Sequence, residues 1–276
     1  MSVRVVTDTA AALTSELAAS WGVRLVPLTV TVDGRSYRDT DLNPAMLAAG
    51  RVTTAGPTPG EFMAALQDAP DGAVVITVAA SLSSTNAAAH MAASVCDAPV
   101  EVVDSRTAAG AQALVVLAAV DQAAQGRDVH TVAESARVAA RSVRVAGFLE
   151  NLDGLARSGR VPGLAADAAR KTGLQFMFTL RDGSIKPARP ATSRASALDR
   201  LVELCLASND PEHAADVMLL GRADGLDERL DNAVAAGRLT IGRRLTGAFG
   251  TAITLYTGPG VTGLAWTLRG SDRVLI

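Results

Sequence analysis

The sequence has few aromatic residues, few cysteines and no excess of basic charge. Phe, Trp and Tyr make up 3% of its 276 residues, so we expect any apolar cavity to be lined mainly by aliphatic side chains and methionine. Such a lining suits an alkyl chain better than a planar ring. The formal net charge is −2, which does not favour binding to nucleic acid. The two cysteines, Cys96 and Cys205, lack metal-ligand spacing and are expected to be reduced core thiols.

A signal peptide and a long apolar run are also missing. Met1-Ser2-Val3-Arg4 leads directly into a predicted strand, and no uninterrupted apolar stretch is long enough to cross a bilayer. We therefore expect a cytoplasmic protein without stable membrane insertion, as a monomer or weak dimer. Hydrophobic residues make up 49% of the chain and charged residues 20%, which predicts a well-filled core.

The common enzyme motifs are absent. The chain contains no Gly-x-Ser-x-Gly nucleophile motif, no Gly-Lys-Ser/Thr phosphate loop and no complete Gly-x-Gly-x-x-Gly after its first strand. His90, His130 and His213 are scattered without the spacing of metal ligands. We therefore expect no metal and no cofactor. What remains is a set of hydroxyl groups without an obvious base, which is typical of anion binding.

Hydroxyl residues gather after one strongly apolar segment. The β-branched run Val74–Ala80 predicts a strand, Ser81–Thr85 a loop, and the alanine-rich Ala87–Ala93 a helix. Ser and Thr before a helix are ordinary caps. A helix start also offers unpaired N–H groups and partial positive charge, so the same cluster is a candidate site for a carboxylate or phosphate. Both interpretations stay open at this point.

The first half of the chain alternates strands and helices, which predicts a parallel sheet covered by helices on both faces. Strands are expected at Val3–Val6, Val74–Ala80 and Val100–Val103. Each is followed by polar residues: Thr7-Asp8-Thr9, the loop Ser81–Thr85, and Asp104-Ser105, respectively. Ligands bind beyond the carboxyl ends of such strands, so these three clusters are expected to converge.

The segment Val52–Phe62 is rich in glycine and proline, which predicts a fixed loop. Thr58 is followed by Pro59 and by Glu61 three residues later, the order of a capping box. Thr54 has no such local role, which makes it a candidate ligand residue. A short helix is expected just before this segment, over Ala45–Ala49.

The pattern changes after about residue 145 and predicts an α+β region with a largely antiparallel sheet. A hairpin is expected around Asp182-Gly183, and a glycine-terminated helix over Leu152–Val161. Later strands are expected at Val217–Leu220, Leu239–Arg243, Ala252–Tyr256 and Gly263–Leu268. The predicted fold is α/β: an N-terminal parallel-sheet α/β/α domain (1–145) packed on a C-terminal α+β domain (146–276).

Short motifs along nearly the whole chain are similar to those of the DegV family of bacterial fatty-acid-binding proteins. They occur in the family's order: Val5-Val6-Thr7-Asp8-Thr9-Ala10, Val26-Pro27-Leu28, Thr54-Ala55-Gly56-Pro57-Thr58-Pro59, Leu82-Ser83-Ser84-Thr85, Val103-Asp104-Ser105, Gly159-Arg160-Val161, Asp182-Gly183 and Thr257-Gly258-Pro259-Gly260. Any one of them is short, but eight in the right order are specific.

The resemblance implies a long-chain fatty acid held between two domains, in a binding protein that is not an enzyme. Its carboxylate would contact Thr54 and Ser83. The other expected ligand contacts are Ser84, Thr85, Tyr256 and Gly258. Some family members present the acid to a separate acyl kinase, and the acyl phosphate then enters phospholipid synthesis. Arg160 and Arg194 match basic positions that serve the kinase or the phosphate.

Two residues at this expected site depart from the family pattern. Ser84 stands where the family has glycine, a position that would favour glycine if it required positive φ. Tyr256 stands where the family usually has histidine before Thr-Gly-Pro-Gly. A phenol still donates a hydrogen bond, but it is longer than imidazole and neutral at pH 7. Head-group binding is therefore expected to differ from that of relatives.

Three functions stay open from the sequence. The first is a fatty-acid carrier. The second is an enzyme that acts on a small phosphorylated or carboxylated metabolite at the same hydroxyl cluster, with Asp8 or Asp104 as general base. The third is a sensor or scaffold that a bound lipid only stabilises. A long apolar cavity would favour a lipid, and a short polar cleft would favour the enzyme.

Overall fold

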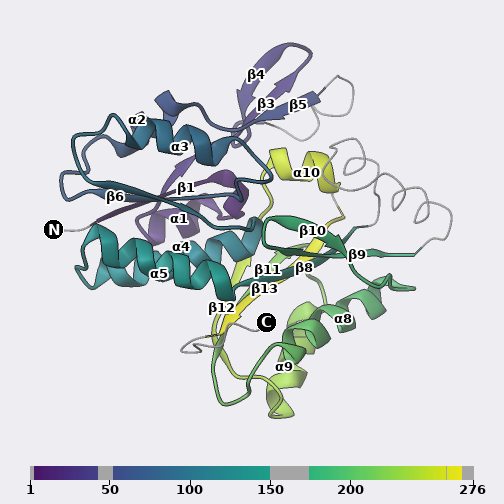
Figure 1. Cartoon of the computed structure of the whole chain (residues 1–276). Coiled ribbons are helices and arrows are strands. Elements are labelled where there is room, and N and C mark those ends of the chain that lie inside the picture. The colour runs from purple at the N-terminus through teal and green to yellow at the C-terminus, as the bar shows by residue number, and fades with distance from the viewer. Residues whose placement is uncertain (1–2, 43–51, 150–173, 259, 269–276) are drawn as a thin grey trace.

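A parallel four-stranded sheet forms the centre of the N-terminal half. The computed structural model describes residues 3–42, 52–149, 174–258 and 260–268 (Figure 1). The strand order is β2 (Arg24–Val26), β1 (Arg4–Asp8), β6 (Ala73–Thr77) and β7 (Val100–Asp104), and every neighbouring pair is parallel. The predicted parallel sheet is therefore confirmed.

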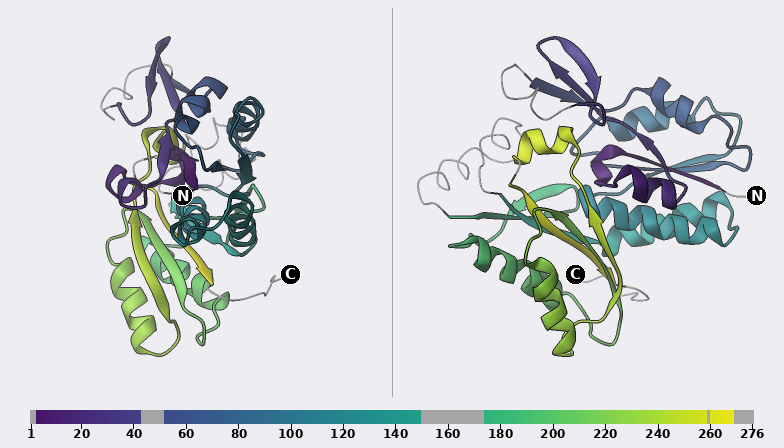
Figure 2. Two further views of the ribbon diagram at one scale, coloured as in Figure 1. Left: turned by 90° about the vertical axis from the view of Figure 1, so that its left-hand side faces the viewer. Right: turned by 180° about the vertical axis from the view of Figure 1, so that it is seen from behind.

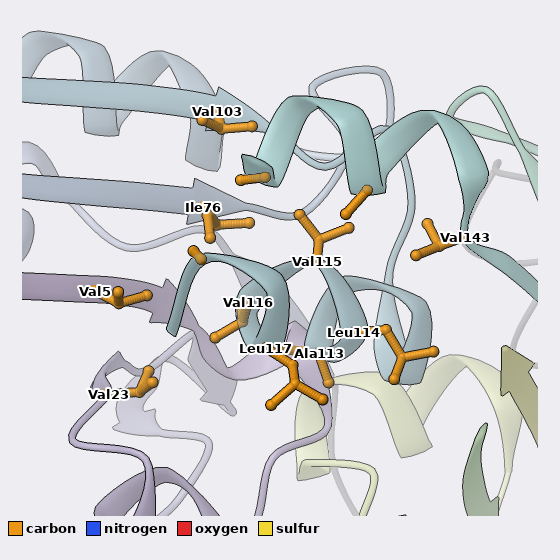
Figure 3. Packing of buried hydrophobic residues seen from close by; sticks show 14 of the residues in the cluster. Val5, Val23, Ile76, Val103, Ala113, Leu114, Val115, Val116, Leu117 and Val143 are labelled. Carbon is orange, nitrogen blue, oxygen red and sulfur yellow. The ribbon is translucent and has the colours of Figure 1, made fainter. Parts of the chain in front are cut away.

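Helices cover both faces of this sheet because its strands are apolar on both sides. Val5, Ile76 and Val103 point to one face and pack against α4 (Ala109–Ala124) and α5 (Val129–Ser142) (Figure 3). The alternate side chains point to the other face, where they pack against α2 (Pro59–Leu66) and α3 (Thr85–Ala93). A 3-10 turn η1 (Thr9–Ala11) and α1 (Ser15–Ser20) follow β1.

The long helix α4 lies between the two halves of the molecule. Its Ala, Val and Leu residues are buried almost all round the helix, since it packs against the first sheet and also against strands of the second. At its start, a Cβ on Gly110 would lie 3.0 Å from both the Cβ of Ala265 and the Cδ1 of Leu220. The small residues of α4 therefore allow it to approach the second sheet closely.

The second sheet has six strands and is mostly antiparallel, as predicted. Its strands follow the order β10 (Ser184–Pro187), β9 (Phe176–Arg181), β8 (Arg144–Leu149), β13 (Thr262–Leu268), β11 (Ala215–Gly221) and β12 (Ile241–Gly247). Only the β11–β12 pair is parallel among these described strands. Helices α8 (Arg194–Ala207) and α9 (Leu226–Ala235) cover the face turned away from α4 (Figure 2).

The β9–β10 hairpin confirms the two-residue turn expected at Asp182-Gly183. Both residues have positive φ, at 50° and 70°, which is the conformation that such hairpin turns require. The division of the chain into domains at residues 145 and 146 stays a prediction. One apolar cluster runs across it, joining Val5 and Leu114 to Val145 and Leu180.

A small third sheet corrects one prediction. Its order is β4 (Arg35–Arg38), β3 (Thr29–Val32) and β5 (Val52–Ala55), so the segment expected to be a loop begins with a strand. Thr54 pairs with Val30 of β3. The β-branched residues of β5 form a strand because β3, distant in sequence, supplies hydrogen-bond partners, and such pairing is not visible locally.

A second correction concerns Ala252–Tyr256, which was predicted as a strand. The chain forms helix α10 (Thr251–Thr257) there, between Gly250 and Gly258, whose φ is +77°. Ala252 is buried against Leu28 and Val78, and this packing outweighs the weak helix preference of threonine and isoleucine. Strand β12 also begins at Ile241, two residues later than predicted. The helices expected over 45–49 and 152–161 lie outside the described residues.

Candidate functional site

A cavity of about 440 Å³ lies where the carboxyl edge of the first sheet meets α10 and the second sheet. Its walls are mostly apolar, and their apolar residues are Ala10, Leu28, Ala55, Gly56, Val78, Leu82, Ala108, Ala109, Val145, Ala146, Phe178, Leu180, Ile185, Leu220, Phe249, Ala252, Ile253, Val261 and Gly263. The volume is within the usual range for a ligand of drug size, roughly 300–1,000 Å³.

The composition of these walls corrects one expectation from the sequence. No described methionine lines the cavity, whereas Phe178, Phe249 and Tyr256 do, although aromatic residues are scarce in this chain. Methionine is used instead in the packed interior, as at Met177 and Met218, which are fully buried. The expectation of mainly aliphatic walls is confirmed.

The polar groups on the cavity wall are uncharged. Hydroxyl side chains are contributed by Thr54, Ser83, Ser84, Tyr256 and Thr257, and no described Asp, Glu, Lys, Arg or His lines the cavity. Within the described residues, no group of three or more His, Cys, Asp or Glu side chains could hold a metal ion. The described part of the cavity wall therefore offers hydrogen-bonding hydroxyl groups and no charged side chain.

Helix α10 contributes one face to the cavity. Ala252, Ile253, Tyr256 and Thr257 all line it, at the spacing i, i+1, i+4, i+5 that places residues on one side of a helix. A strand would have pointed successive side chains to opposite sides. The hydroxyl of Tyr256 is hydrogen-bonded to that of Thr54, which lies on β5, far from α10 in the sequence. Two residues 202 positions apart are thus joined at the cavity wall.

Ser83 is brought near the end of β5 by a close approach of Gly56. A Cβ on Gly56 would lie 2.6 Å from the Oγ1 of Thr85 and 3.3 Å from the Oγ of Ser83, so only glycine brings the β5–α2 loop this near to α3. The Ser83 and Thr85 hydroxyls are 2.8 Å apart, and Ser83 Oγ also accepts a bond from the Thr85 N–H. Thr85 is fully buried and does not line the cavity, so it supports Ser83 from behind.

Ser84 occupies the N-cap position before α3, but its side chain makes no capping hydrogen bond. Its φ is −70°, an ordinary value, so serine replaces the family's glycine here without backbone strain. Its side chain is exposed and reaches the cavity rim. By contrast, Thr58 forms the predicted capping box with Glu61 at the start of α2. The local prediction was therefore right for Thr58, and the Ser81–Thr85 cluster has no standard side-chain cap.

Three other predicted residues lie away from the cavity wall or outside the described chain. Gly258 ends α10 and does not line the cavity. The Arg194 guanidinium is bonded to the Arg222 carbonyl and to Thr262 Oγ1, and it lies 5.4 Å from the centre of the Phe148 ring. These contacts hold α8 against the second sheet. Arg160 is outside the described residues.

The two carboxylates considered as general bases serve the backbone instead. Asp8 is fully buried, and its carboxylate accepts bonds from the N–H groups of Ala10 and Val78, at 3.0 and 2.8 Å. Burial raises the pKa of Asp8 to about 6. Asp104 accepts bonds from the N–H groups of Ala80 and Arg106. Neither aspartate lines the cavity. The ends of β1, β6 and β7 lie together, as predicted, and they are joined by the hydrogen bonds from the backbone to Asp8 and Asp104.

The β9–β10 hairpin closes one wall. The hydroxyl of Ser81 donates to the carbonyl of Gly183 at 2.7 Å, and the N–H of Gly183 donates to the carbonyl of Arg106. An ion pair of 2.9 Å between Arg106 and Asp182 adds to this contact at the surface. The wall-forming residues Leu180 and Ile185 flank this turn, and they were not predicted as site residues, because nothing in their local sequence marks them.

Comparison with known proteins agrees with this fold. A family model for uncharacterised proteins of the DegV family matches residues 2–269. The chain belongs to the DegV family. A DegV domain-containing protein of Mycobacterium tuberculosis is 33% identical to this DegV chain over 283 residues, which cover 96% of each chain. The resemblance seen in the sequence motifs is thereby confirmed.

Solved structures of DegV proteins share the fold. A DegV family protein from Thermus thermophilus, described as binding fatty acid, matches with a TM-score of 0.85 and 27% identity, covering 97% of this chain and 100% of that one. A DegV family protein from Eubacterium eligens, loaded with heptadecanoic acid, matches with a TM-score of 0.83 and 21% identity, covering 96% and 99%. At 21% identity, the match to the Eubacterium eligens protein shows a similar fold and nothing more.

Within the described residues, none of the helices is both long enough and apolar enough to pass through a lipid bilayer.

Proposed function

We propose that this protein binds a long-chain fatty acid, with the carboxylate at Thr54 and Ser83 and the acyl chain in the apolar cavity. The observation that carries the proposal is a cavity whose only polar side chains, among the described residues, are neutral hydroxyls gathered near α3 and α10. A carboxylate needs donors, and an alkyl chain needs an apolar wall. One molecule with both parts fits this lining.

The acyl chain is expected to supply most of the binding energy, and the hydroxyl groups to compensate for the desolvation of the carboxylate. A hydrogen bond to a charged group is worth about 1.5–3 kcal/mol, so two or three hydroxyl donors offset much of the cost of removing a carboxylate from water. Each buried methylene adds about 0.8 kcal/mol. Binding should therefore depend on both the ionised head and the length of the chain.

Native mass spectrometry of the purified protein, followed by solvent extraction, tests this proposal. We expect a co-purified acid of roughly 14 to 18 carbons, given the favourable contribution of each methylene. After delipidation, the protein should take up palmitate and oleate with one site per chain. A protein that is purified empty and then fails to take up any C14–C18 acid would refute fatty-acid binding.

We further propose that the bound acid is presented, in the cytoplasm, to a separate acyl kinase whose acyl-phosphate product enters phospholipid synthesis. The lining supports a carrier because it holds no described acid or base that would activate the carboxylate. Arg160 and Arg194 are the proposed contacts with the kinase or the phosphate. The test incubates loaded protein with ATP and a candidate kinase and traps acyl phosphate as the hydroxamate. A sensor or scaffold would bind the lipid but give no hydroxamate.

A further inference from the structure

A row of four residues crosses the second sheet on the side that faces the cavity. Phe178 of β9 pairs with Gly147 of β8, Gly147 pairs with Gly263 of β13, and Gly263 pairs with Leu220 of β11. These strands lie side by side in the middle of the sheet (Figure 1). Phe178, Gly263 and Leu220 all line the cavity. The two central residues of this row, Gly147 and Gly263, are glycines, so no side chain covers the sheet backbone there.

The packing around Gly147 explains why that residue is glycine. A Cβ there would lie 2.7 Å from Cζ of Phe178 and 2.9 Å from the carbonyl oxygen of Thr262. The Phe178 ring is therefore stacked on the bare backbone of its cross-strand partner. Any larger residue at position 147 would displace both the ring and a neighbouring strand.

Backbone conformation does not explain glycine at position 263, and packing explains it less fully than at position 147. Its φ is not in the positive range, and a Cβ there would lie 3.2 Å from the Ala146 carbonyl oxygen and 3.4 Å from Cδ1 of Leu220. To admit a methyl group, the Ala146 carbonyl oxygen would have to move by a few tenths of an ångström, which is less than the groups around Gly147 would have to move. Glycine inside a strand weakens the strand, and it often marks a place where a ligand approaches the backbone closely.

The neighbouring residue Ala146 shows that the sheet backbone itself is exposed to the cavity. Its side chain belongs to the core on the opposite face of the sheet, with Met177 and Leu201, yet Ala146 is among the residues that line the cavity. Its main chain must therefore form part of the wall, beside Gly263.

We propose that Gly263 determines which acyl chains fit, by leaving the sheet backbone bare where the chain lies against it. This inference rests on the proposed fatty-acid binding. The acyl chain occupies the space that a side chain at position 263 would fill, next to Leu220. A substitution there shortens the usable cavity without removing any polar contact to the carboxylate.

The proposal predicts that substitution of Gly263 weakens binding more than it destabilises the empty protein. In delipidated protein, Gly263→Ala should melt closer to the wild type than Gly147→Ala does, because its methyl group displaces its neighbours less and alanine disfavours the unfolded chain. Its affinity for long acids should nevertheless fall, and that of Gly263→Val should fall further. Gly147→Ala is the matched control, because Gly147 belongs to the same row and its packing requires glycine. The delipidated Gly147→Ala protein should melt at a lower temperature than the wild type.

The experiment measures the affinity of the delipidated wild type, Gly263→Ala and Gly263→Val for saturated acids from octanoate to stearate. Octanoate should bind all three equally. Above the length that reaches Gly263, the wild type should gain affinity with each methylene and Gly263→Val should not, so the two diverge by about fourfold for each excluded methylene.

Two results would overturn this role for Gly263. One is a variant that follows the wild-type length dependence through stearate. The other is a Gly263→Ala protein whose melting temperature, when delipidated, falls as far as that of Gly147→Ala, which would give Gly263 a purely structural role. If the wild type itself binds no acid of any length, the proposed function fails instead, and the two failures are therefore distinct.

Discussion

Replacing Thr54 by valine removes one hydroxyl from the cavity wall while keeping the shape of the side chain. In the folded protein this hydroxyl is bonded to the Tyr256 hydroxyl and faces the cavity. Loss of one hydrogen bond to a carboxylate costs about 1.5–3 kcal/mol, which corresponds to roughly 10- to 150-fold weaker binding of palmitate. Stability should fall by only about 0.5–1.5 kcal/mol, because the lost internal bond joins two neutral groups.

Thr257→Val is the matched control for this change. Thr257 also lines the cavity, and it undergoes the same chemical replacement, but its hydroxyl donates to the carbonyl of Ile253 within α10 at 3.1 Å. The Thr257 hydroxyl has already donated its hydrogen to this carbonyl, whereas the Thr54–Tyr256 pair keeps one O–H to donate to a carboxylate, so palmitate affinity should change little in Thr257→Val. The comparison separates the loss of a head-group contact from the general effect of a hydroxyl-to-methyl change in the cavity.

Calorimetric titration of delipidated protein provides the measurement, with palmitate and hexadecanol as paired ligands. The alcohol has the same chain without the carboxylate, so Thr54→Val should weaken palmitate binding much more than hexadecanol binding. If palmitate affinity stays within twofold of the wild type, or if both ligands weaken equally, Thr54 does not hold the carboxylate and the head-group assignment is wrong.

Three further outcomes are expected. Ser83→Ala should weaken palmitate binding about tenfold or more and also lower the melting temperature, because Ser83 holds the start of α3. Gly56→Ala should destabilise the protein by about 1–3 kcal/mol, since its Cβ would lie 2.6 Å from a threonine oxygen, whereas Gly60→Ala, with its nearest atom at 3.9 Å, should not; thermal unfolding compares them. Burial raises the pKa values of Asp8 and Asp39 from 3.8 to about 6. The folded state then binds these protons more tightly than the unfolded state, so their contribution is complete below about pH 4 and is lost as pH rises through 6. Urea unfolding should give a lower free energy at pH 7 than at pH 5, and Asp39→Asn should reduce that difference.

Local sequence signals were reliable where a local cause decides the structure. The capping box at Thr58 and the hairpin turn at Asp182-Gly183 formed as predicted, because each depends on residues within four positions of one another. Local signals gave wrong predictions where contacts with residues distant in sequence decide the structure. The segment Val52–Ala55 is a strand only because β3 pairs with it. Thr251–Thr257 is a helix because its apolar residues pack against the third sheet and line the cavity.

The sequence by itself determined the α/β fold class, the family, and the candidacy of Thr54, Ser83 and Tyr256. It did so because strand and helix periods, strand-end hydroxyls and family motifs are properties of consecutive residues. Only the tertiary structure decided that Thr54 and Tyr256 touch, that Thr85 lies behind Ser83, and that Gly263 leaves the sheet backbone bare. A cavity is the space that packing leaves between elements far apart in the chain, and no pattern in one segment specifies its shape.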